Sequence, residues 1–169
     1  MLVTNSPFCL PSPVAEMGDA KAQQSERPKA VQVEIHPEPF SPWQRLESCC
    51  DGFAASAVFI GRVRPESAQG EHLDALELTH YPGMCERRID EDAERLRQLH
   101  GAGSVLVLHR VGRLSPGEVI VLVVVQADRR GPAQRCCNEL LEVLKHDAPF
   151  WKREWCGDQG AWLSGNTPL

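Results

Sequence analysis

Hydrophobic positions recur along the chain with two periods, one typical of β-strands and one typical of α-helices. Alternating or continuous apolar runs, rich in β-branched residues, predict strands at residues 31–35, 53–63, 73–80, 104–112 and 118–126. Spacings of three and four residues predict amphipathic helices at about 42–50, from residue 84 to near Gly101, and from Pro132 to a point before Pro149. The core side of the last helix is expected to carry Cys136, Cys137, Leu140, Leu141 and Leu144.

The order of these elements favours an α+β fold with a largely antiparallel sheet and packed helices. The strands at 53–63 and 73–80 flank a polar loop and are predicted to pair as a hairpin. The strands at 104–112 and 118–126 are almost continuously apolar, which predicts that they are buried on both faces.

The first 30 residues differ from the rest of the chain in composition. They are rich in Pro, Ser, Ala and Gln, and seven of the 13 prolines fall within residues 1–42. Such a segment buries too little apolar surface to offset the entropy lost on ordering, so residues 1–30 are predicted to be a disordered tail. Residues 31–169 are then expected to form one domain, in line with a common domain size of about 100–200 residues.

Composition and charge argue against several classes of protein. The longest apolar run, residues 119–125, is far shorter than the roughly 18–20 residues that span a bilayer, so no membrane partner is expected. The N-terminus does not read as a secretory signal, and we predict a cytoplasmic protein. With 18 basic against 23 acidic residues, the chain lacks the charge balance typical of nonspecific nucleic-acid binding.

The sequence also predicts that the protein uses no metal and no cofactor. Its seven cysteines have no C-x-x-C spacing and fit neither a disulfide framework nor a zinc site. His80 and His109 have no Cys, Asp or second His at metal spacing nearby, and we interpret both as hydrogen-bonded structural residues. Dinucleotide-binding, P-loop and serine-hydrolase motifs are absent.

A group of cations surrounds the end of the last predicted helix. The stretch LKHDAPFWKREW, residues 144–155, places Lys145 at the helix end and Lys152 just after a proline break. The helix dipole favours a cation at Lys145, and the break allows the chain to bring both ammonium groups to one pocket. Alternatively, Lys145 only complements the helix end, and Lys152 and Arg153 form a solvated charge run.

Two pairs of arginines follow predicted strands in other parts of the chain. Arg62 and Arg64 close one buried strand, and Arg129 and Arg130 follow another, just before a helix. Side chains at strand ends on a rigid sheet commonly carry binding groups. The three cationic pairs are therefore candidates for a single anion-binding site.

Four motifs stand in a fixed order along the chain. They are FIGRVR at 59–64, LELTHYPGM at 76–84, LHRVGRLSPGE at 108–118 and, the most specific, LKHDAPFWKRE at 144–154. Together they resemble the large, catalytic subunit of molybdopterin synthase over about residues 31–155. The resemblance implies an α/β-hammerhead-like fold.

The resemblance further implies a sulfur-transfer reaction. In this family a cyclic pyranopterin monophosphate receives two sulfur atoms and becomes the dithiolene of molybdopterin. The sulfur comes from a small ubiquitin-like carrier subunit, which holds it as a thiocarboxylate on its C-terminal Gly-Gly. The large subunit forms a homodimer within a heterotetramer. Phosphate, thiocarboxylate and acyl oxyanion are all negative, which accounts for a cationic site.

Residue roles are carried over by position in the motifs. Lys145 and Lys152 match the two functional lysines of the family and are expected to be catalytic, with Lys145 leading. The expected substrate-binding residues are Arg62, Arg64, Arg129, Arg130, Lys152 and Arg153. Burial would lower the pKa of a catalytic lysine while a helix end would raise it, so the choice between base, acid and covalent anchor for Lys145 stays open.

One position departs from the family pattern, because Arg129 stands where the family usually has histidine. Arginine can replace a histidine that only donates to phosphate, but it cannot transfer a proton at ordinary pH. The main alternative is therefore a catalytically weak docking module for the sulfur-carrier subunit. A phosphate-ligand binding protein without a partner is the other alternative.

Overall fold

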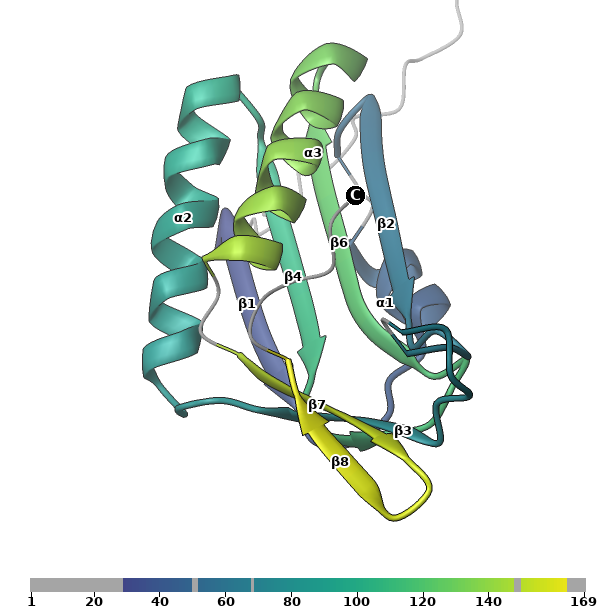
Figure 1. The fold of residues 1–169 in the computed structure, drawn as a ribbon. Coiled ribbons are helices and arrows are strands. Elements are labelled where there is room, and N and C mark those ends of the chain that lie inside the picture. The colour runs from purple at the N-terminus through teal and green to yellow at the C-terminus, as the bar shows by residue number, and fades with distance from the viewer. Residues whose placement is uncertain (1–28, 50–51, 68, 148–149, 164–169) are drawn as a thin grey trace, which may run out of the picture.

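The structure is a computed structural model that describes residues 29–49, 52–67, 69–147 and 150–163. In these residues the chain forms two four-stranded sheets (Figure 1). The first has the order β1 (Val31–His36), β4 (Ser104–Arg110), β6 (Val119–Ala127), β2 (Ala55–Arg62). The second has the order β5 (Gly112–Leu114), β3 (Ala75–Thr79), β7 (Trp151–Cys156), β8 (Gln159–Trp162).

Strand pairing confirms the predicted α+β class. β1 runs parallel to β4, whereas β4 and β2 each pair antiparallel to β6. In the second sheet β3 pairs antiparallel to β5 and β7, and β7 to β8. The structure thus has the largely antiparallel strands and packed helices that the element order predicts.

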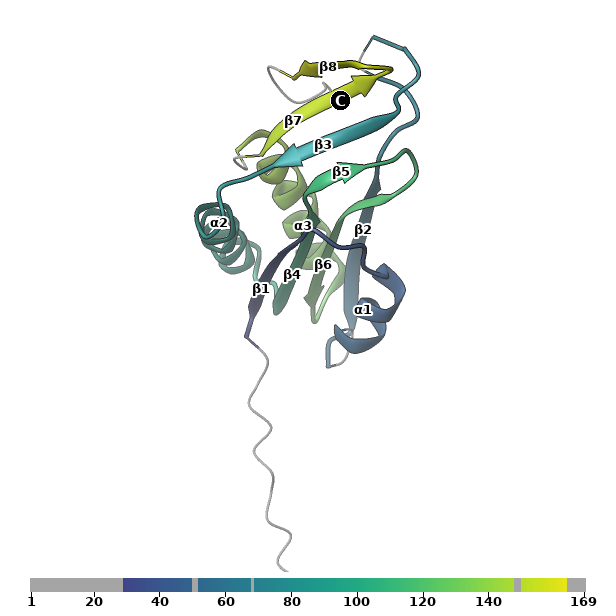
Figure 2. The same cartoon turned by 90° about the horizontal axis from the view of Figure 1, so that it is seen from below.

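Helices cover both faces of the first sheet. Figures 1 and 2 show α2 (Met84–His100) and α3 (Arg130–His146) on one face and α1 (Pro42–Cys49) on the other. Val105, Val107, Val123 and Val125 pack toward α2 and α3, while Leu106, Leu108, Leu122 and Val124 form a separate cluster with Leu46 of α1. Because both sides of β4 and β6 are covered, the predicted burial on both faces is confirmed.

The hairpin predicted from the strands at 53–63 and 73–80 is wrong. β2 pairs with β6 in the first sheet, and β3 pairs with β5 and β7 in the second. A hydrogen bond of 2.9 Å from the amide of Val63 to the carbonyl of Glu118 carries the β2–β6 alignment to the point where the chain leaves for the second sheet. Val63, Leu73, Leu78 and Leu114 form a small core at this junction.

Helix α3 begins two residues earlier than the sequence predicts. Arg129 is its N-cap and Arg130 its first residue, so Pro132 lies inside the first turn rather than at the start. Proline is tolerated there because the first-turn amides have no partner within the helix. Cys136 and Cys137 are buried, as the helical spacing predicts.

The strands β5, β7 and β8 have no counterpart in the sequence prediction. β7 has the sequence WKREWC, in which neither set of alternate residues is consistently apolar. This pattern is a weaker strand signal than the valine-rich runs of the first sheet. The predicted tail at 1–30 falls outside the described residues except for Lys29 and Ala30. No helix in the described part of the chain is long and apolar enough to cross a membrane.

Candidate active site

A cavity of about 530 Å³ lies where the second sheet meets the C-terminal end of α3. Four of the predicted site residues line it together: Arg62, Arg64, Lys145 and Lys152. They come from the end of β2 and the loop after it, the last turn of α3, and β7. Three segments far apart in the sequence therefore place positive charge around one cavity.

Strand alternation directs Lys152 into this cavity. Lys152 and Glu154 occupy alternate positions of β7 and both line the cavity, together with Leu76 and Leu78 of the neighbouring strand β3. Lys152 lies opposite Leu78 in the β3–β7 register. The lysine is thus held by a regular strand pair and not by a loop.

The end of β2 bends where its arginines begin. The register between β2 and β6 shifts between Gly61 and Arg62. A Cβ at Gly61 would lie 2.7 Å from the Cγ1 of Val121, so only glycine fits this approach of the two strands. After the shift, the Nη1 of Arg62 donates a hydrogen bond of 2.8 Å to the carbonyl of Gly117, which ties the Arg62 guanidinium to the rim of the cavity.

The surroundings of Lys152 disfavour its positive charge. Burial lowers the pKa of Lys152 below its ordinary value, and the positive charge of Lys145 lowers it further. A buried lysine with a second cation nearby has a larger fraction of free amine at neutral pH than a surface lysine. Lys152 is therefore suited to accept a proton.

Carboxylates and apolar side chains complete the wall. Glu66, Glu142 and Glu154 line the cavity, and Glu154 is buried, with 5% of its surface exposed. Leu73, Leu76, Leu78, Ile120, Leu144 and Leu163 supply apolar surface. A cavity with several cations, a few carboxylates and an apolar floor suits an organic anion better than an inorganic ion alone.

His109 also lines the cavity, although the sequence predicts a structural role for it. Its Nδ1 lies 2.8 Å from the carbonyl oxygen of Arg110, so it is hydrogen-bonded as expected. The directions of the strands account for its place. β2 and β4 run in the same direction because both are antiparallel to β6, so Arg62 and His109 end at the same edge of the sheet.

Arg153 was expected to bind substrate, and the structure places it elsewhere. It follows Lys152 in β7 and so faces the opposite side of the sheet. There its guanidinium carbon lies 4.1 Å from the ring centroid of Trp155 and 5.4 Å from that of Trp162. In this chain Arg153 supports the outer face of the second sheet.

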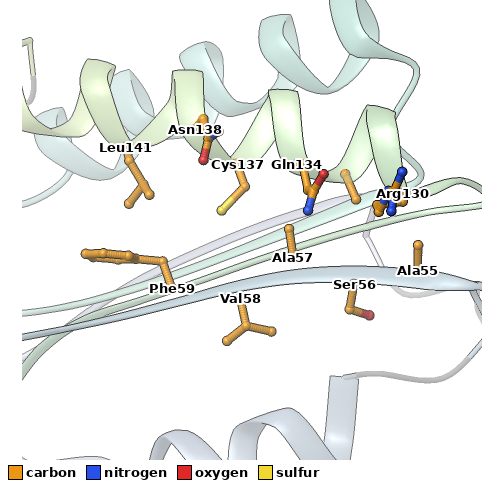
Figure 3. A pocket seen from close by; sticks show the side chains of 11 residues that line it. Ala55, Ser56, Ala57, Val58, Phe59, Arg130, Gln134, Cys137, Asn138 and Leu141 are labelled. Carbon is orange, nitrogen blue, oxygen red and sulfur yellow. The ribbon is translucent and has the colours of Figure 1, made fainter.

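Arg129 and Arg130 lie at the other end of α3. At a rise of about 1.5 Å per residue, roughly 22 Å of helix separates Arg130 from Lys145. Arg130 instead lines a second pocket of about 380 Å³ between α3 and β2, with Ser56, Gln134 and Asn138 (Figure 3). One chain alone does not bring this arginine pair to the lysines.

The described residues contain no group of three or more His, Cys, Asp or Glu side chains that could hold a metal ion.

The cysteines of α3 are unsuited to act as nucleophiles. Burial raises the pKa of both Cys136 and Cys137 to about 11, so their thiols stay protonated at neutral pH. The ionisable groups that the cavity offers are its amines, its guanidinium groups, its carboxylates and its imidazole.

Comparison with known proteins points to one family. The family described as MoaE protein matches residues 35–147. Among curated relatives, the molybdopterin synthase catalytic subunit of Cereibacter sphaeroides is 38% identical over 137 residues, which are 79% of this chain and 92% of that protein. The Escherichia coli protein of the same name is 37% identical over 138 residues, covering 79% and 89%. A structure of molybdopterin synthase from Staphylococcus aureus matches with a TM-score of 0.70 and 28% identity, covering 80% of this chain and 98% of that one.

Proposed function

The chain belongs to the MoaE protein family and is an enzyme of molybdopterin biosynthesis, and from this membership we propose the reaction that it catalyses. In this proposal it is the catalytic subunit of molybdopterin synthase. It transfers sulfur from the C-terminal thiocarboxylate of a small carrier subunit to cyclic pyranopterin monophosphate. Two such transfers give the dithiolene of molybdopterin.

One observation carries the proposal: Arg62, Arg64, Lys145 and Lys152 meet around one cavity of about 530 Å³. The pterin phosphate and the carrier thiocarboxylate are both anions, and each needs positively charged donors when it leaves water. Once the sulfur has bonded to the pterin, water cleaves the acyl–sulfur bond and releases the carrier as a carboxylate. This hydrolysis passes through an oxyanion, which fixed cations stabilise. A surface with separate cations would serve none of these steps as well.

The residues can be assigned separate roles within this proposal. Arg62 and Arg64, at the β2 end of the cavity, bind the phosphate. Lys145, in the last turn of α3, activates the thiocarboxylate and stabilises the oxyanion from the wall of the cavity. Lys152, whose pKa is lowered by burial and by Lys145, accepts the proton that water loses when it attacks the carrier's acyl group.

The proposed partners follow from the same chemistry. A ubiquitin-like carrier that ends in Gly-Gly has a tail slim enough to reach a cavity floored by leucines, where it meets Lys145 and Lys152. The proposed assembly is a homodimer within a heterotetramer. In it, Arg129 and Arg130 of one subunit lie beyond the reach of their own lysines and serve the cavity of the other.

A docking module of low activity is the second candidate, favoured by Arg129 in the place of the family histidine. An arginine there still binds phosphate but cannot transfer a proton. The two candidates predict the same binding of the carrier. They differ in turnover, so only an activity measurement separates them.

The test is reconstitution with thiocarboxylated carrier and cyclic pyranopterin monophosphate, with formation of the dithiolene followed over time. Lys145→Ala and Lys152→Ala are each expected to reduce turnover by about 10²–10⁴-fold, the usual range for loss of an acid–base group. Lys29→Ala is the matched control, because Lys29 is exposed and pairs with Asp90 at 2.7 Å, outside the cavity. An inactive parent that binds the carrier would establish the docking module. Lysine variants as active as the parent would disprove the assigned roles.

A further inference from the structure

One ring nitrogen of His109 already makes a hydrogen bond to the backbone. It lies near the end of β4, is 8% exposed and lines the cavity. Its Nδ1 lies 2.8 Å from the carbonyl oxygen of Arg110, and a carbonyl can only accept, so Nδ1 carries the proton and donates it. In the neutral ring, Nε2 is then an acceptor with no hydrogen of its own.

Phe150 connects this ring to Lys152. The rings of His109 and Phe150 are stacked, with centroids 4.1 Å apart and an interplanar angle of 15°. Phe150 stands two residues before Lys152 and immediately before β7. The ring centroid of Phe150 is also 6.3 Å from that of His80. The stack therefore anchors the chain immediately before β7, the strand whose alternation directs Lys152 into the cavity.

The imidazole is uncharged in this position. Burial lowers the pKa of His109 to about 4, against the opposing effect of its bond to Arg110, and the charges of Lys152 and His80 lower it further. The ionisable groups around it are numerous. Those that line the same cavity are Arg62, Arg64, Glu66, Glu142, Lys145, Lys152 and Glu154.

We propose that His109 is a positioning residue for Lys152. Its ring, held by the Arg110 carbonyl, is the platform for Phe150 and so sets where the Lys152 side chain enters the cavity. Its Nε2 adds an uncharged hydrogen-bond acceptor to a wall that is rich in cationic donors. A protonated imidazole would repel Lys152 as a further cation in this wall, and an absent one would leave Lys152 without this acceptor.

Core packing alone would require only a ring of suitable size. A phenylalanine at position 109 keeps a flat ring for Phe150 but removes both nitrogens, whereas leucine at position 150 removes the stack but keeps the imidazole. The two variants His109→Phe and Phe150→Leu therefore separate the acceptor from the platform. His100→Gln is the control, because His100 is also partly buried but bonds to Glu139 at 2.6 Å at the far end of α2.

The first readout needs neither carrier nor pterin. The full-length protein is acylated with an amine-specific reagent over a range of pH, and mass spectrometry gives the rates at Lys152 and Lys29. We expect the Lys152 rate at pH 8 to change at least about threefold in His109→Phe and in Phe150→Leu, while Lys29 and the His100→Gln protein stay at parent values. Parent-like labelling of Lys152 in both folded variants would overturn the proposal. If His109→Phe does not fold, labelling of Phe150→Leu decides alone.

The second readout rests on the proposed function. In the reconstituted reaction we expect each variant to lower kcat by about tenfold with little change in KM, because a displaced amine affects the chemical step more than substrate binding. Unchanged kcat in both variants would overturn the positioning role. An inactive parent that still shows the labelling differences would overturn the proposed function and leave the positioning of Lys152 supported.

Discussion

The two ends of α3 carry cations in different surroundings. At the C-terminal end, Lys145 is partly buried and shares a cavity with Lys152, Arg62 and Arg64. At the N-terminal end, Arg130 is exposed and lines a smaller pocket with uncharged polar side chains (Figure 3). The sequence treats these charges alike, whereas the structure groups some and separates others. Cations act together when they line the same cavity, and closeness in the sequence is not enough.

The largest effect expected at the N-terminal end of α3 tests whether the two ends belong to one site. Arg130→Ala is expected to lower kcat/KM by about 10²-fold, as does loss of one fixed donor to an oxyanion or phosphate. Since roughly 22 Å of helix separates Arg130 from Lys145 in one chain, its contribution must come from a second copy. The measurement is the turnover of the reconstituted enzyme.

Mixing two inactive variants sharpens this prediction. If Arg130→Ala and Lys145→Ala subunits are unfolded and refolded together, half of the dimers are mixed, and each mixed dimer has one intact cavity. Activity is then expected to return to about a quarter of the parent value. Separate pools that are mixed without refolding are the control. No recovery would show that each cavity works within one chain.

A smaller effect concerns stability. Because the pKa of Lys152 is lowered in the folded protein, the unfolded chain binds more protons between the folded pKa and the ordinary value of 10.5, and stability rises with pH across this interval. Lys152→Met removes the penalty of burying a charge. It is expected to stabilise the protein by about 1 kcal/mol at pH 7, a modest gain because the side chain is only partly buried.

Urea unfolding at pH 7 and at pH 10 measures this difference. The advantage of Lys152→Met over the parent should shrink at the higher pH, where the folded parent loses the buried charge. Lys29→Met is the control, with no gain expected at either pH. Equal stability of parent and Lys152→Met at both values would show that Lys152 is fully solvated.

A still smaller effect is expected from Arg129→His, which restores the residue usual in the family. If position 129 only donates to phosphate, kcat/KM of the variant should be up to about threefold lower than that of the parent above pH 6.5, where the histidine loses its charge. Below pH 6.5 the two proteins should have the same kcat/KM. If the position transfers a proton, the same change should instead raise kcat. The pH profile of kcat/KM distinguishes the two outcomes.

The sequence predicted the first sheet better than the second. The continuous valine-rich runs of β4 and β6 predict strands that are buried on both faces. The helical pattern of apolar residues in α2 and α3 extends over enough turns to identify both helices. The strands of the second sheet are short and mixed in polarity, so tertiary pairing decides them. The predicted hairpin was wrong because local sequence does not say which sheet a strand joins.

The site shows the same division. The proline break between Lys145 and Lys152 predicted that these two lysines lie close together. The strand end at Arg62 and Arg64 predicted that these two arginines are binding residues. Their common cavity required the second sheet, which the pattern did not predict. His109 was missed because its role depends on Phe150, and a stack between residues 41 positions apart leaves no periodic signal.

The smallest effect on activity is expected for Arg153→Ala. The neighbouring substitution Lys152→Ala is expected to have one of the largest effects. The two residues are adjacent, but alternation along β7 points Lys152 into the cavity and Arg153 to the outer face, over Trp155 and Trp162. Loss of Arg153 should therefore change kcat/KM less than about twofold and cost about 0.5–1 kcal/mol of stability through the lost cation–π contact.

Arg113→Ala is the matched control for this pair, because its guanidinium carbon lies 4.6 Å from the Trp155 ring on the same face. Both arginine variants should lower the free energy of unfolding by similar small amounts while turnover stays near the parent value. If Arg153→Ala instead lowers turnover as much as Lys152→Ala, the outer face takes part in the reaction. The cation would then act on a carrier or a second subunit seated against β7 and β8, and the division between cavity and outer face would no longer describe where the chemistry is carried.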